Sequence, residues 1–266
     1  MPEPALLGGR AARRPPGRDR VIVLSGLAAA AALAWAYVLY MGWGMAHMDA
    51  GMAMAIMPRM TDWHIVDLLL VLAMWAIMMA AMMLPSVVPM VLSFASLSRR
   101  QRAHQLPYVP TGVFVLGYLA VWSAFSLGAT LAQWGLLEAR LVTPMMVSAT
   151  PWVAAALLVF AGIFQFTPLK QACLAKCASP LGFLLTEWRE GTFGAWIMGV
   201  RHGTYCVGCC ALLMTLLFVF GVMNVVWIVA VSVYVLLEKI LPRARWLRFV
   251  GGVLLICWGV AVAAGI

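Results

Sequence analysis

Residues 65–84 read IVDLLLVLAMWAIMMAAMML, and this run decides the class of fold. It contains one charged side chain, Asp67, and it reaches the roughly 20 apolar residues that carry a helix across a bilayer. The rest of the chain has the same character: 65% of its residues are hydrophobic and 10% are charged, whereas a soluble domain has about 25% charged residues. The sequence therefore predicts an all-α, polytopic membrane helix bundle.

Apolar runs on both sides of this segment predict about seven transmembrane helices, with six as the alternative. The expected spans are Val21–Trp43, Ile65–Leu84 with an extension towards Leu97, Val109–Trp134, Trp152–Pro168, His202–Val222, Val225–Leu237 and Phe249–Ile266. The fourth and sixth are the shortest, and a count of six would move the C-terminus to the other side. The first run exceeds the roughly 7–15 residues of a signal-peptide core, so we expect an uncleaved span.

Basic residues predict the orientation of the chain, because cytoplasmic loops carry an excess of Lys and Arg. With the N-terminus inside, only Arg59 and Arg140 fall outside. The clusters that fall inside are Arg10, Arg13, Arg14, Arg18 and Arg20; Arg99, Arg100 and Arg102; Lys170, Lys176, Arg189 and Arg201; and Lys239, Arg243, Arg245 and Arg248. We expect a disordered cytoplasmic tail at 1–20 and one transmembrane domain at 21–266. The net charge of +9 comes from basic residues between the apolar runs and not from a basic face of a folded domain, so nucleic acid is not an expected partner.

A methionine-rich stretch follows the first span, in a loop of about residues 44–63 that this topology places outside. Met45, Met48 and Met52 are three and four residues apart, so a helical turn would put them on one face. Thioethers suit Cu(I), need no deprotonation and cannot form disulfides in an oxidising compartment. We therefore predict Met45, His47, Met48 and Met52 as metal ligands, with methionine as a flexible apolar filler as the alternative.

The second span continues this chemistry with Met78 and Met82, which are four residues apart on one helix face. We predict both as further metal ligands, and packing of a membrane helix is the alternative interpretation. Pro85 and Pro89 follow, and Pro85 leaves the carbonyl of Ala81 without its helical hydrogen bond. This pattern indicates either a kink made for packing or a broken helix beside a binding site.

Cysteines in the second half of the chain form another group of candidate ligands, two of them in an expected cytoplasmic loop of about residues 169–201. They recur at steps of three or four residues, so that those on one helix are neighbours. We expect them near the cytoplasmic ends of their spans, where metal binding is favoured over a structural disulfide. Gly199, Gly203 and Gly208 would let a second helix approach, so that the loop could fold back onto the same place. The predicted ligands are Cys173, Cys177, His202, Cys206, Cys209 and Cys210.

Three strings carry a resemblance: MWAIMMAAMMLP at 74–85, FTPLKQACLAKC at 166–177 and MGVRHGTYCVGCC at 198–210. They resemble a bacterial family of predicted metal-binding integral membrane proteins, over roughly Asp67 to Pro242. Some members of that family are associated with copper delivery to secreted copper enzymes. The resemblance implies metal handling in the bacterial inner membrane. The methionine-rich loop lies outside the matched region, so its assignment rests on ligand chemistry alone.

These features predict a protein that is not an enzyme and that binds, chaperones or traffics Cu(I) towards a secreted or membrane copper enzyme. Zinc is the second candidate metal, and membrane lipid is the expected surrounding. Two alternatives stay open: a membrane thiol-disulfide redox protein that uses the paired cysteines, and a metal-free assembly scaffold. The chain contains neither Gly-x-Ser-x-Gly nor a P-loop, so hydrolysis has no support. Asp67 and Glu238 fall near span ends, where interfacial hydration or pairing is expected.

Overall fold

The computed structural model describes residues 17–47, 64–103, 110–139, 151–241 and 245–265, and the regular elements in these ranges are all α-helices. They are α1 (Gly17–His47), α3 (Ile65–Ala103), α4 (Thr111–Glu138), α5 (Pro151–Phe164), α6 (Pro168–Ala178), α7 (Pro180–Glu187), α8 (Gly191–Thr215), α9 (Leu217–Phe220), α10 (Val225–Ile240) and α11 (Arg245–Ala264). Five stretches, namely α1, α3, α4, α8 with α9, and α11, are long and apolar enough to cross a membrane. The bent pair of α5 and α6 makes a sixth candidate. The all-α fold class is confirmed, and several of these helices have the length and apolarity of membrane spans.

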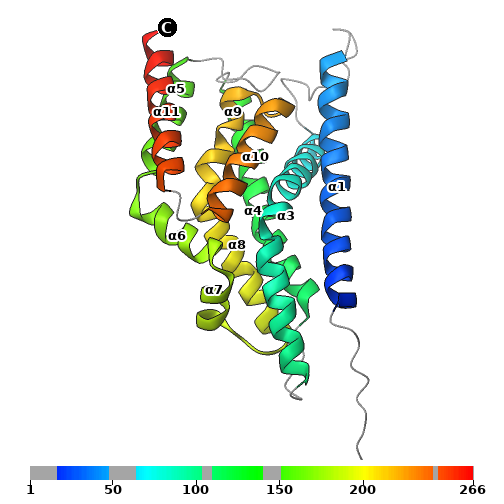
Figure 1. The fold of residues 1–266 in the computed structure, drawn as a ribbon. Helices are drawn as coiled ribbons and strands as arrows, with labels where there is room; N and C mark the ends of the chain where they lie inside the picture. The colour runs from blue at the N-terminus through cyan, green and yellow to red at the C-terminus, as the bar shows by residue number, and fades with distance from the viewer. Residues whose placement is uncertain (1–16, 48–63, 104–109, 140–150, 242–244, 266) are drawn as a thin grey trace, which may run out of the picture.

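Successive long helices alternate in direction (Figure 1). The chain ascends in α1, descends in α3, ascends in α4, descends in α5, ascends in α8, descends in α10 and ascends in α11. The end of α11 therefore lies at the same end of the bundle as the start of α5. At 16 residues, α10 is shorter than the candidate spans, so the count of seven and the N-in orientation stay predictions.

Helix starts follow local sequence signals. Pro168 is the first residue of α6, where its missing N–H costs no hydrogen bond. Thr167 caps this helix by accepting a hydrogen bond from the Lys170 backbone N–H at 3.3 Å. At the start of α3 the Asp67 carboxylate accepts from the His64 backbone N–H at 3.0 Å, which gives this acidic residue a capping role.

The prolines of α3 bend the helix without breaking it. The helix continues through Pro85 and Pro89, and Figure 1 shows its first part tilted away from the direction of its second part. Ser232 of α10 donates a hydrogen bond to the Met82 carbonyl at 3.4 Å, which lies next to the Ala81 carbonyl that Pro85 leaves without its helical partner. Of the two interpretations left by the sequence, a broken helix is therefore wrong for α3.

Glycines let α8 approach both of its neighbours. A Cβ atom on Gly199 would collide with the carbonyl oxygen of Phe114 in α4, and one on Gly203 would also be crowded by α4. A Cβ atom on Gly208 would lie 2.9 Å from the sulfur of Cys173 in α6. The expectation that these three glycines admit a second helix is confirmed, with α4 on one side and α6 on the other.

Gly199→Ala is expected to destabilise the protein by about 1–3 kcal/mol, because the atom that must give way is backbone in a packed interface. Gly128→Ala in α4 is the matched control, since nothing lies within 4 Å of the added Cβ atom. Unfolding in detergent, followed by circular dichroism, measures both. Equal stability of the two variants would contradict this account of the interface.

Candidate metal centre

The thiols of α8 face the interior of the bundle. Cys206, Cys209 and Cys210 have exposed fractions of 0%, 2% and 1%. His202, one turn earlier on the same helix, is 1% exposed. These four predicted ligands therefore face protein neighbours instead of lipid, which is a requirement for a shared site.

A short helix brings a further thiol to the same place. The segment from 169 to 201 forms α6, α7 and the beginning of α8. The Cys177 thiol of α6 lies beside the thiols of Cys206 and Cys209, near enough for their side chains to interact. Cys173, one turn before Cys177, is half-buried beside Gly208. We call Cys177, Cys206, Cys209 and Cys210 the thiol cluster, because they meet where α6 crosses α8.

The helix that carries Cys206, Cys209 and Cys210 begins well before the predicted start of the span. The sequence placed the beginning of this span at His202, but the helix begins at Gly191. Arg201 lies within the helix and forms an exposed ion pair with Glu187 of α7, so its charge does not end the helix. Cys206 consequently follows several turns of packed helix and lies well inside α8.

The thiols as they stand do not form a finished coordination sphere. Cys209 and Cys210 both donate to the carbonyl oxygen of Cys206, with sulfur to oxygen distances of 3.1 and 2.8 Å. Within the ranges that the structure describes, no three His, Cys, Asp or Glu side chains are placed to hold a metal ion.

Aromatic side chains close the site on the side of α4. The Tyr118 hydroxyl lies 3.2 Å from the Cys206 sulfur. The His202 ring packs against Tyr118, Phe114 and Phe183, with centroid distances of 5.8, 6.1 and 5.3 Å. Its Nδ1 atom is buried without a hydrogen-bond partner, which is an uncommon state that coordination of a ligand would resolve.

A lysine completes the surroundings of the thiol cluster. The Lys239 ammonium of α10 lies 3.0 Å from the Cys206 sulfur, 2.8 Å from the Ser86 hydroxyl and 3.8 Å from the Met83 sulfur. Lys239 belongs to a basic cluster predicted to mark the orientation of the chain, but its side chain is buried among helices. The cluster thus has a lysine amino group in contact with one of its sulfurs.

A second buried charge lies one residue earlier in α10. Both Glu238 carboxylate oxygens accept from the Lys170 ammonium of α6, at 2.9 and 2.8 Å, and Lys170 also donates to the Gln165 side chain. The side chains of this ion pair are 0% and 2% exposed. The expected pairing of Glu238 is confirmed, and its partner Lys170 lies in α6, a helix within the segment that the sequence predicts as a loop. The sequence carries one local sign of these contacts, which is the acidic Glu238 directly before the basic Lys239. Adjacent residues point about 100° apart on a helix, so the two side chains can reach different neighbouring helices.

The predicted methionine ligands of α3 lie in the core. Met78 and Met82 are each 1% exposed, and Met79 and Met83 are each 0% exposed. Among these four, Met83 reaches the surroundings of the thiol cluster through Lys239. The spacing of four residues predicted two side chains of the buried face of α3, and Met83, one residue after Met82, is the one that contacts the Lys239 ammonium.

Most of the predicted ligands of the methionine-rich loop lie outside the residues that the structure describes. The side chain of Met45 and the residues Met48 and Met52 lie outside the described part of the structure. His47 is exposed at the end of α1, where its ring stacks on Trp43 at 4.6 Å and its Nδ1 atom lies 2.9 Å from the Trp43 carbonyl oxygen. The structure therefore does not bring His47 to the thiols.

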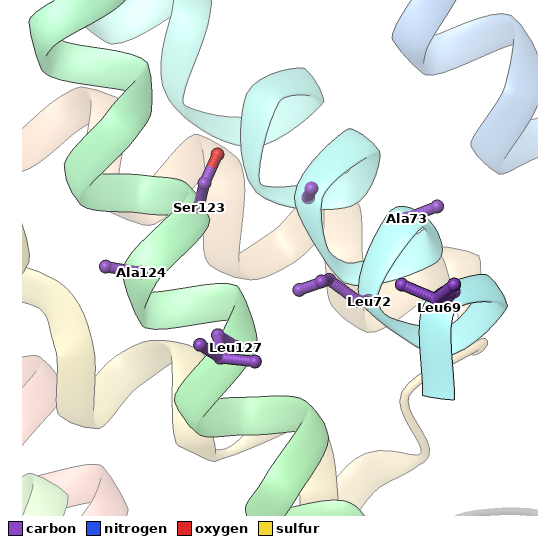
Figure 2. Close-up of a pocket in the computed structure, with 7 residues that line it drawn as sticks. Leu69, Leu72, Ala73, Ser123, Ala124 and Leu127 are labelled. Carbon is purple, nitrogen blue, oxygen red and sulfur yellow. The ribbon is translucent and has the colours of Figure 1, made fainter. Parts of the chain in front are cut away.

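An open groove of about 470 Å³ lies elsewhere, between α3 and α4 (Figure 2). Its lining residues are Leu69, Leu72, Ala73, Ala76, Ser123, Ala124 and Leu127. Figure 2 shows Leu72 extending from α3 toward α4. Apart from the Ser123 hydroxyl this lining is aliphatic, so the groove offers contact to lipid and no soft metal ligand.

Comparison with known proteins gives one match. No curated protein and no solved structure matches this chain. A family model described as PpoB2, copper chaperone, matches residues 72–262. This range includes all the predicted cysteine ligands, Met78 and Met82, and it leaves out the methionine-rich loop. Because the match covers most of the sequence, the chain belongs to the PpoB2 copper chaperone family.

Proposed function

We propose that this protein binds Cu(I) at the thiol cluster inside its helix bundle and passes the ion towards a copper enzyme outside the membrane. The observation that carries the proposal is the meeting of Cys177 from α6 with Cys206 and Cys209 from α8. Membership of a copper chaperone family supports copper as the cargo and a role without catalysis. Soft thiolate and thioether ligands suit Cu(I) better than hard cations.

The charges around the cluster support a monovalent ion. Two thiolates with one Cu(I) carry a net charge of −1, and an uncompensated charge is costly inside a membrane bundle. Lys239, whose ammonium contacts the Cys206 sulfur, would bring the total to zero. A bis-thiolate site with one buried lysine is therefore neutral with Cu(I) and positive with Zn²⁺, which favours copper over zinc here.

Two groups of residues would complete the ligand set. His202, with its unpartnered Nδ1 atom, and Met83, which lies beside Lys239, are the neighbours that would extend the thiol cluster. In the proposed N-in orientation within a bacterial inner membrane, the loop with Met45, Met48 and Met52 would exchange Cu(I) on the outer side. These thioethers would then pass copper to or from the enzyme that receives it.

Purified protein is expected to retain Cu(I) through desalting under anaerobic, reducing conditions and to compete with bicinchoninate for the ion. Zn²⁺ offered at the same concentration is expected to be lost on the same column. Metal analysis of the eluted protein measures both. A protein that retains no copper, yet oxidises and re-reduces its cysteines reversibly, would contradict the proposal in favour of the thiol-disulfide alternative.

A further inference from the structure

The helix that carries Cys177 is held by a contact that is not part of the thiol cluster. α6 has 11 residues and follows α5 after a bend of 65°, so its direction is not fixed by continuity with a long helix. Within its first turn, the Lys170 ammonium reaches both carboxylate oxygens of Glu238 at 2.9 and 2.8 Å. Both side chains are shielded from solvent, so this charge-assisted contact is geometrically demanding.

The same contact connects the two sides of the thiol cluster. Cys177 lies two turns after Lys170 in α6, and residues seven apart lie on one face of a helix. Glu238 is followed in α10 by Lys239, whose ammonium lies 3.0 Å from the sulfur of Cys206 in α8. One turn of α10 therefore contacts α6 through its carboxylate and α8 through its ammonium.

We propose that Lys170 and Glu238 are positioning residues that set the approach of Cys177 to Cys206. Neither member of the pair forms a hydrogen bond with a thiol, and the pair acts by fixing where α6 lies against α8. The inference deepens the proposed function, since it names what assembles that same site. It does not depend on copper, because the geometry it explains is that of the metal-free protein.

Disulfide formation between Cys177 and Cys206 measures this geometry directly. The parent protein keeps these two cysteines and carries serine at 173, 209, 210 and 257. Diamide takes two electrons and two protons from the two thiols, which form one S–S bond, and is itself reduced to the hydrazine. The rate is followed by the mobility shift of a fragment cut between α6 and α8, with and without reductant.

Lys170→Met with Glu238→Gln removes both charges and is expected to slow the cross-link at least about tenfold, because small misplacements of reacting groups have effects of this size or larger. The exchanged pair, Lys170→Glu with Glu238→Lys, is expected to restore most of the parent rate. Glu238→Asp keeps the charge on a shorter side chain and is expected to give an intermediate rate. This variant tests the same contact if the neutral pair does not fold.

The matched control is Glu187→Gln with Arg201→Met, which removes the exposed ion pair between α7 and α8 and is expected to leave the rate unchanged.

The inference is overturned if the neutral pair cross-links at the parent rate, or if the exposed control slows the reaction as much. The outcome is independent of copper. A protein that binds no copper but shows the expected rates would remove the proposed function and leave the positioning role intact. A protein that binds copper but whose neutral pair cross-links at the parent rate would remove the positioning role and leave the proposed function intact.

Discussion

Cys206→Ser is expected to lower the affinity of the protein for Cu(I) by at least about 100-fold, since even residues behind the ligands of a metal site contribute 10–100-fold. Cys206 is the most connected sulfur of the cluster. It contacts the Cys177 thiol, the Tyr118 hydroxyl and the Lys239 ammonium. A serine hydroxyl has nearly the same shape, but it is a hard ligand that must lose a far more tightly held proton.

The measurement is a competition titration of Cu(I) between bicinchoninate and the purified variant under anaerobic conditions. Cys257→Ser is the control, because Cys257 is an exposed cysteine in α11 and lies outside the thiol cluster. The control is expected to bind as the unaltered protein does. If both variants bind equally well, the cysteines of α8 are packing residues and the proposed site is wrong.

Lys239→Met is expected to weaken Cu(I) binding by about 10–100-fold, the range for residues that support a metal site from behind its ligands. The physical reason is electrostatic. Methionine has a similar length, but without the ammonium a bis-thiolate copper site would carry an uncompensated negative charge among buried helices. The loss is therefore expected in the affinity for copper and not in the number of ions bound at saturation.

Two further variants test this reason. Lys239→Arg keeps the charge and is expected to retain more affinity than Lys239→Met. Lys176→Met removes a lysine that is next to Cys177 in the sequence. The Lys176 ammonium lies on the surface, 3.5 Å from the Thr186 hydroxyl, so the affinity of this variant for Cu(I) is expected to stay unchanged. Equal affinities for the methionine and arginine variants at Lys239 would show that its charge plays no part.

Much of the fold follows from the sequence, because the length and apolarity of a run are sufficient to predict a membrane helix. The expected spans correspond to α1, α3, α4, α5, α8, α10 and α11. The step of four residues also predicted that Cys206 and Cys210 share the buried face of α8. The expectation that the preceding segment, residues 169–201, folds back holds for Cys177, which lies beside Cys206 and Cys209.

The buried charges could not be predicted in the same way. Lys170 and Glu238 are 68 residues apart, and Lys239 and Cys206 are 33 apart, so neither contact has a local signal. A rule that counts Lys and Arg along the chain places every base at an interface. It fails where a base has a partner on another helix, because pairing lowers the cost of burial.

X-ray absorption at the copper edge of the Cu(I)-loaded protein tests the central claim most directly, because it reports the atoms bound to copper. The account predicts sulfur scatterers in the first coordination sphere, which decrease in number when Cys177, Cys206 and Cys209 are replaced by serine. A first sphere of nitrogen and oxygen alone, or a sulfur signal that these replacements leave unchanged, would contradict it.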